Sequence, residues 1–208
     1  MSPVKTRKAL LERKSKETEI KVDLNIDGQG KTKIKTPIGI LSHMLELFAF
    51  HGLFDLNLEV KKADLKIDIH HTNEDIGIVL GKAFQKALGK KEGIRRFGFA
   101  AAPMEDVVTY FVIDISGRGH HKIDVEGLTP QSSGDGYTFT YFEHFIESFA
   151  KSLGANINIK INNPMNSTAD IHTVLETIFK SFGLALDQAT QIDPRRKGNI
   201  PSTKGVID

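Results

Sequence analysis

Polar and apolar residues alternate in several stretches of the chain, and this alternation predicts β-strands. Residues 18–27 are apolar at every second position and end in an Asp-Gly turn, so they predict a half-buried strand. Residues 31–35 alternate again, which predicts a hairpin partner for that strand. Residues 56–69 predict a second strand pair, and residues 107–115 form a strongly apolar strand.

Apolar residues recur at helical spacing in four other stretches. Residues 39–50 predict a helix that carries His43, and residues 71–88 predict a longer helix that ends at Gly89. Further along, a helix is expected over residues 144–153, a strand over 155–161 and a helix over 172–189. Residues 127–138 are rich in turn-forming residues.

The later stretches repeat the earlier ones. A shift of 101 residues places residues 41–49 on 142–150, so that His43 coincides with His144. A shift of 102 places residues 70–74 on 172–176 and Gly81 on Gly183. Such a repeat indicates duplication, with two similar half-domains related by a pseudo-twofold axis.

The duplicated order of elements predicts an α+β fold in which each half is a sheet layer packed on helices. The expected boundaries are a solvated basic arm over residues 1–16, a first half over 17–92 and a second half over 93–192. Residues 193–208 form a C-terminal tail.

Composition narrows the chemistry. The 208 residues include 39% hydrophobic residues, enough for a substantial core, and no cysteine, which excludes disulfides, iron–sulfur clusters and a thiol nucleophile. A net charge of +2 gives no support for a nucleic-acid partner. The sequence has neither an apolar run of the ~20 residues that a membrane span needs nor a signal-peptide core, so a cytoplasmic protein without a membrane partner is expected.

Without cysteine, a metal ion would be bound by imidazole nitrogen and carboxylate oxygen, which suits manganese, iron or zinc. His70 and Glu74 lie at positions i and i+4 of a predicted helix start, and His172 and Glu176 repeat this spacing. Any single histidine here could instead be a satisfied polar side chain at a helix end. The repeated set predicts two metal sites, with His43, His70, His71, Glu74, His144, His172 and Glu176 as ligands.

Several segments, in fixed order between Arg13 and Ile207, resemble the imidazoleglycerol-phosphate dehydratase family. They are Gly39-Ile40-Leu41-Ser42-His43-Met44-Leu45, His51-Gly52-Leu53-Phe54-Asp55, His70-His71-Thr72-Asn73-Glu74-Asp75-Ile76-Gly77, Gly93-Ile94-Arg95-Arg96-Phe97-Gly98, Asp114-Ile115-Ser116-Gly117-Arg118 and Pro201-Ser202-Thr203-Lys204-Gly205. The resemblance implies a manganese enzyme with two metal sites. It also implies a homo-oligomer of twenty-four subunits, with active sites between subunits.

The resemblance further implies dehydration of imidazoleglycerol phosphate to imidazole-acetol phosphate through a metal-stabilised imidazolate. It matches Glu17 and Glu176 to the proton-transfer residues. It matches the substrate's phosphate site to Arg96, Arg118, Lys180, Ser202 and Lys204.

The chain also departs from the family pattern. Thr173 replaces the second histidine expected beside His172, and a hydroxyl is a poor ligand, so one metal site is expected to be weakened. Ser42 replaces an aspartate expected before His43. His120 and His121 offer either a substitute ligand or two surface residues.

Two functions therefore stay open: an active dehydratase, or a non-catalytic or repurposed paralogue that keeps the fold, the assembly and part of the metal binding. The complete phosphate set favours the enzyme. A dinuclear hydrolase would explain the metal sites but not that set.

Overall fold

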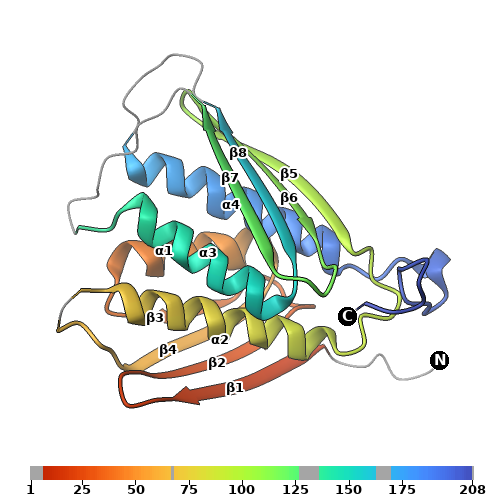
Figure 1. Ribbon diagram of the computed structural model, residues 1–208, viewed down its shortest axis with the longest axis horizontal. Helices are drawn as coiled ribbons and strands as arrows, with labels where there is room; N and C mark the ends of the chain where they lie inside the picture. Colours follow the sequence, from red (N-terminus) through yellow and green to blue (C-terminus); the bar gives the residue numbers. More distant parts are fainter. Residues whose placement is uncertain (1–6, 67, 127–135, 163–169, 208) are drawn as a thin grey trace.

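The computed structural model describes residues 7–207 apart from 67, 127–135 and 163–169. Two four-stranded sheets enclose a layer of helices (Figure 1). The N-terminal sheet has the strand order β1-β2-β4-β3, and the C-terminal sheet has the order β5-β6-β8-β7. The first half contains β1 (Lys8–Lys14), β2 (Glu19–Asn25), β3 (Thr32–Lys35), α1 (Gly39–His51), β4 (Asp55–Lys62) and α2 (His70–Leu88).

The second half repeats this order element by element. It contains β5 (Phe97–Met104), β6 (Val107–Asp114), β7 (His120–Glu126), α3 (Phe139–Leu153), β8 (Asn156–Asn162) and α4 (Ile171–Thr190), followed by the short 3-10 helix η1 (Pro194–Arg196). Strand order and pairing directions agree between the two sheets. The predicted α+β fold with duplicated halves is thereby confirmed.

The core lies between each sheet and the helices. Helix α2 packs against β1 and β2, whereas α4 packs against β5 and β6. Helix pairs cross between the halves, since α1 packs against α4 and α3 against α2, while α1 also contacts β3 and α3 contacts β7 of their own halves. Strand alternation supplies the buried faces: Ile20, Val22 and Leu24 of β2 are fully buried, as the pattern of residues 18–27 predicts.

Two glycine contacts of the same kind allow these crossed helix pairs to approach. A methyl group on Gly183 of α4 would collide with the carbonyl oxygen of Phe48 in α1. A methyl group on Gly81 of α2 would collide with the carbonyl oxygen of Phe149 in α3. The sequence repeat relates Gly81 to Gly183 and Phe48 to Phe149. The duplication therefore extends to these closest helix contacts.

Three expectations about the strands were wrong. Residues 8–14 do not belong to a solvated arm: they form β1, which pairs antiparallel with β2 and buries Ala9 while its charged residues stay at the surface. Residues 32–35 do not close a hairpin with β2, because β4 lies between β2 and β3 and pairs with β3 in parallel. Alternation identifies a strand but not its partner.

The predicted second strand after β4 is also absent from the described residues of 63–69. Asp64 and Thr72 instead hold this segment against the start of α2, through bonds of 3.0 Å from the Asp64 amide to Thr72 Oγ1 and from that hydroxyl to the Asp64 carbonyl. Strands β5 and β7 were not predicted, and α3 begins five residues before the expected start at residue 144. Of the turn-rich residues 127–138, 127–135 lie outside the described part of the chain.

Candidate metal centres

The first candidate metal centre, the α1–α4 cluster, consists of His43, His172 and Glu176. Each offers a ligand atom, and these atoms lie within 4.8 Å of one another. Glu176 Oε1 lies 2.9 Å from His172 Nε2 and 3.3 Å from His43 Nε2. The two imidazole rings stack with their centroids 5.2 Å apart.

The second candidate centre, the α2–α3 cluster, consists of His70, Glu74 and His144. Glu74 Oε1 lies 3.1 Å from His70 Nε2, and the His70 and His144 ring centroids are 4.5 Å apart. The Nδ1 atom of His144 is buried and has no hydrogen-bond partner. Burying a polar nitrogen without a partner is costly, so a ligand that binds there is favoured.

The two clusters are built in the same way across the halves. In each, one helix supplies a histidine and a glutamate one turn apart, and the facing helix of the other half supplies a single histidine. The sequence repeat predicted equivalent places for these residues. It did not predict that each place combines both halves, because that depends on which helices pack together.

The Glu176 carboxylate is held in its ionised form. Burial raises its pKa, but hydrogen bonds from Lys180, His43 and His172 outweigh this effect and lower the pKa to about 2. Lys180 Nζ lies 2.5 Å from Glu176 Oε2. The predicted phosphate ligand Lys180 therefore lies at the α1–α4 cluster, and its ammonium group is paired with a metal-ligand candidate.

Glu17, Asp64 and His71 form a third group, more exposed than the two clusters. His71 Nδ1 lies 3.0 Å from Asp64 Oδ2 and 3.8 Å from Glu17 Oε2. The hydrogen bond to Asp64, and then the charge of Glu17, raise the pKa of His71. His71 thus turns away from its own neighbours His70 and Glu74.

The segment that carries Glu17 is fixed to α2. Asp75, which is 7% exposed, accepts hydrogen bonds from Arg13 Nη1 at 2.7 Å and Thr18 Oγ1 at 2.5 Å. The Ser15 hydroxyl accepts hydrogen bonds from the backbone amides of Glu17 and Thr18. Glu17 is therefore held beside His71 while its side chain stays 54% exposed.

The other predicted phosphate ligands lie at the opposite end of α4. The Arg96 amide donates to the carbonyl of Ala189, and Arg96 Nη1 donates to the carbonyl of Pro201 at 3.0 Å. Ser202 and Lys204 follow Pro201, and Arg118 lies on the loop after β6 with an exposed side chain. Helical rise places Ala189 about 20 Å from Glu176. Figure 1 accordingly shows the starts of α2 and α4 on one side of the molecule and the C-terminal tail on the other.

Comparisons with known proteins agree on one family. The family model for imidazoleglycerol-phosphate dehydratase matches residues 36–186. Over 201 residues the chain is 42% identical to the imidazoleglycerol-phosphate dehydratase of Geobacillus kaustophilus, covering 97% of this chain and 99% of that protein. It is 45% identical over 202 residues to the enzyme of that name from Geobacter metallireducens, covering 97% and 100%. The chain belongs to the imidazoleglycerol-phosphate dehydratase family.

Solved structures of the family have the same fold. The imidazoleglycerol-phosphate dehydratase of Pyrococcus furiosus, crystallised with (S)-C348, superposes with a TM-score of 0.78 at 35% identity, covering 94% of this chain and 99% of that one. The Staphylococcus aureus protein gives a TM-score of 0.75 at 27% identity, covering 89% and 99%.

Against the family pattern, Thr173 is the main departure, and its side chain is buried in α4 at 8% exposure. His120 and His121 do not lie near it. They begin β7 and pair with Asn156 and Ile157 at the start of β8, whereas α4 contacts the far end of the C-terminal sheet through Thr177 and Thr109. About 17 Å of strand separates these ends.

Sequence reasoning missed Asp64, Arg13 and Asp75 as supporting residues of the dehydratase-family motifs. Asp64 lies on a segment predicted as a strand, so its approach to His71 could not be expected. Asp75 lies within a family-like segment and Arg13 marks the start of the resemblance, but only the packing of β1 on α2 brings the two residues together.

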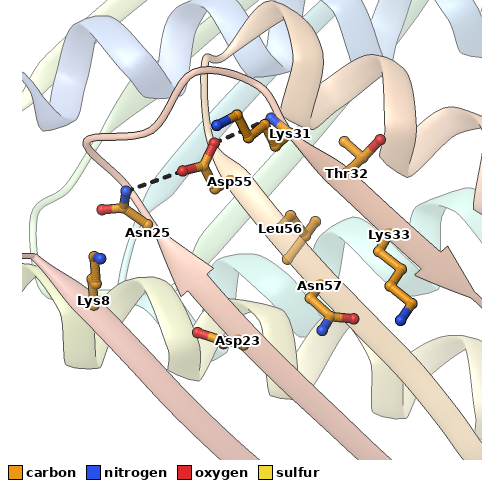
Figure 2. A pocket seen from close by; sticks show the side chains of 9 residues that line it. All are labelled: Lys8, Asp23, Asn25, Lys31, Thr32, Lys33, Asp55, Leu56 and Asn57. Atoms are coloured by element: carbon orange, nitrogen blue, oxygen red, sulfur yellow. Dashed lines mark hydrogen bonds between the residues drawn. The ribbon is translucent and has the colours of Figure 1, made fainter.

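A shallow cavity of about 340 Å³ on the N-terminal sheet contains none of the predicted metal, proton-transfer or phosphate-binding residues, although Asp55 in its lining belongs to one of the family-like segments. Some polar groups of its lining already bond to one another, since Asp55 accepts hydrogen bonds from the Asn25 side chain and the Lys31 amide (Figure 2). Asp55 also accepts one from the amide of Gln29. In the part of the chain that the structure describes, no helix has the length and apolar character to cross a membrane.

Proposed function

We propose that this protein is a metal-dependent dehydratase, a carbon–oxygen lyase of histidine biosynthesis, which converts imidazoleglycerol phosphate to imidazole-acetol phosphate. The observation that carries the proposal is the pair of His-His-Glu clusters in a chain that belongs to the imidazoleglycerol-phosphate dehydratase family. The reaction expels the hydroxyl group from the carbon attached to the imidazole ring and removes the C–H proton from the next carbon, so that one water is lost. The enol that results becomes the ketone.

Two Mn²⁺ ions fit the nitrogen and oxygen donors of these clusters. His43, His172 and Glu176 would hold one ion, and the α2–α3 cluster with its unpartnered His144 nitrogen would hold the other. Bound manganese supplies Lewis acidity toward the substrate's imidazole ring. Thr173 leaves one site a ligand short, so we propose that one ion binds more weakly.

Among the two family-matched acids, the contacts favour Glu17 as the group that moves the proton. Glu176 is paired with Lys180 and two histidines, and its lowered pKa of about 2 makes it a weak base at neutral pH. Glu17 is half exposed and held beside His71. We assign Glu176 to metal binding and Glu17 to the C–H proton.

The substrate's phosphate would bind Arg96, Arg118, Ser202 and Lys204 at the tail end of α4, with Lys180 extending this set toward the metal ions. Since about 20 Å separates that end from Glu176, one chain cannot present both groups to one small substrate. We therefore propose that the active site forms between copies of the chain in a homo-oligomer, with twenty-four subunits as the family resemblance implies.

The outer face of the C-terminal sheet supports such an assembly. Phe97 and Phe99 of β5 are 57% and 55% exposed, and Tyr110 and Val112 of β6 extend the same apolar face. The outer face of the N-terminal sheet carries polar residues such as Asp23 and Asn57 instead. An exposed aromatic surface on one sheet only is typical of a protein contact, here with a second copy.

A non-catalytic paralogue would also keep the fold and part of the metal binding. It would have no need for the substrate groups at both ends of α4. Arg96, Ser202 and Lys204 are all present, and the tail that carries two of them is bonded to Arg96. The dehydratase is therefore the better-supported function.

The test is dehydratase activity of the purified protein after metal removal and reconstitution with Mn²⁺. We expect turnover of imidazoleglycerol phosphate to return with the ion, and Lys204→Ala or Arg118→Ala to raise the KM about tenfold or more while the chain stays folded. Manganese-loaded protein that neither turns over nor binds this substrate would leave the paralogue. Light scattering on the same sample measures the assembly.

A further inference from the structure

Arg96 is held in place by three hydrogen bonds before any substrate binds. Its Nε and Nη2 atoms donate to the two carboxylate oxygens of Asp114 at 2.6 and 3.0 Å. Its Nη1 atom donates to the carbonyl of Pro201 at 3.0 Å. A guanidinium group has five N–H donors, so two remain for a ligand.

The backbone at Arg96 is also constrained. Its φ of +77° lies in the left-handed region, which is unfavourable for a residue with a side chain. The amide donates to Ala189 at the end of α4, and the carbonyl accepts from the amide of Ile115 just after Asp114. This unfavourable backbone conformation directs the Arg96 side chain toward Asp114 and Pro201.

If Asp114 acted only through its negative charge, it would be unfavourable at a phosphate-binding site. A carboxylate next to a phosphate-binding group repels a phosphate dianion and should weaken binding. Asp114 is the last residue of β6, its side chain is 25% exposed, and it pairs with Phe97 in the strand register. The presence of Asp114 is explained if fixing the Arg96 guanidinium group strengthens phosphate binding by more than the charge repulsion weakens it.

We propose that Asp114 is a positioning residue for the substrate's phosphate. It fixes the Arg96 guanidinium through two charge-assisted hydrogen bonds, and Arg96 in turn fixes Pro201 and the tail that carries Ser202 and Lys204. Asp114 does not contact the substrate. This inference rests on the proposed function, because the ligand is the phosphate of imidazoleglycerol phosphate.

The two possible effects of Asp114 have opposite signs, which makes Asp114→Asn informative. Asparagine keeps the size of the side chain but accepts only one of the two bonds from Arg96. If Asp114 positions Arg96, the KM and the inhibition constant of inorganic phosphate should both rise about three- to tenfold, with little change in kcat. If Asp114 acts only by repulsion, both constants should fall.

The Arg96→Ala background provides a second test. A residue that acts through Arg96 has nothing to position there, so adding Asp114→Asn should raise the KM no further, and loss of the repulsive charge should lower it. An equal rise in both backgrounds would overturn the proposal. Asp193→Asn is the matched control, because Asp193 holds exposed Arg195 in a similar pair at 2.5 Å, and we expect it to leave both constants unchanged.

The outcomes separate this inference from the proposed function. A wild-type protein without turnover would contradict the function. A wild-type protein that turns over, with an Asp114→Asn variant of unchanged or lower KM and phosphate inhibition constant, would contradict only the role of Asp114. Thermal melts of all variants identify any loss of folding, which would not by itself raise the KM at constant kcat.

Discussion

His43 and Glu176 are 133 residues apart in the chain, yet His43 Nε2 lies 3.3 Å from Glu176 Oε1. The contact joins α1 of the first half to α4 of the second half, and the repeat-related contact joins α3 to α2. Neither half therefore holds a complete cluster on its own. A half-length ancestor, before duplication, would have needed two copies to form one such site.

The first prediction concerns the independence of the two clusters. His43 and His144 belong to different clusters. Each single variant, His43→Ala or His144→Ala, should therefore lose about one of the two bound metal ions, and the double variant should lose both. Metal content per chain, measured by plasma mass spectrometry after dialysis, tests this. Equal loss of both ions in either single variant would mean that the clusters are not separate sites.

The second prediction concerns the glycine contacts behind the clusters. Gly183→Ala should force α4 away from Phe48 in α1 and weaken metal binding at the α1–α4 cluster, whereas Gly81→Ala should affect only the α2–α3 cluster. Overpacking of this kind costs about 1–3 kcal/mol of unfolding free energy. Each variant is the control for the other.

Chemical denaturation and metal content measure both effects. Metal loss from the distant cluster in either variant would contradict a local cause. Lys82→Ala, next to Gly81 but exposed, should change neither quantity.

Much of this fold could be predicted because the sequence repeats it. Alternation and helical spacing gave β2, α1, α2, α4 and β8 within one or two residues at most ends. The partner of β3 could not be predicted, because the alternation of a four-residue strand suits pairing with β2 as well as with β4. Only the fold places β4 between β2 and β3. Strand β1 was missed because its exposed charges resemble those of a solvated arm.

The site was predicted as a set of residues but not as an arrangement. Motifs identify His70, His71 and Glu74 together, yet His71 faces Asp64 and Glu17 while its two neighbours face His144. Successive helix positions point about 100° apart, so adjacent histidines need not share one ion. The distance between Arg96 and Glu176 likewise follows only from the structure, in which Arg96 contacts the last turn of α4 and Glu176 lies near its first turn.

The third prediction concerns Thr173, whose first-half counterpart His71 lies outside its own cluster. Thr173→His should therefore leave the α1–α4 cluster intact and strengthen a metal site completed by a neighbouring copy, raising both metal retention and activity. In the wild-type protein a chelator titration should remove one ion before the other. The variant should lose both together.

Two equally tight ions in the wild-type protein would mean that another residue has taken the place of the missing imidazole. No change on Thr173→His would mean that Thr173 is not at a ligand position. Because Thr173 is buried, a thermal melt must show that the larger side chain is accommodated.

The fourth prediction concerns Asp187 on α4. Burial raises the pKa of this carboxyl, and a hydrogen bond from Gln191 and the charges of Arg95 and Arg7 only partly offset the effect. A carboxyl whose pKa is higher in the folded chain than in the unfolded chain favours folding while it is protonated, and this contribution is lost as the pH rises through the folded pKa. At neutral pH the ionised Asp187 should therefore destabilise the chain.

Asp187→Asn removes that charge and keeps an oxygen that can accept from Gln191. It should raise the free energy of unfolding at about pH 7.5 and give a smaller gain at about pH 4, where a larger fraction of the wild-type carboxyl is protonated. Denaturant titrations at the two pH values measure the difference, with Asp23→Asn on the exposed face of β2 as the control that removes the same charge. A gain of equal size at both pH values would place its origin in packing rather than ionisation, and a loss at neutral pH would mean that Arg95 and Arg7 stabilise the carboxylate more than burial opposes it.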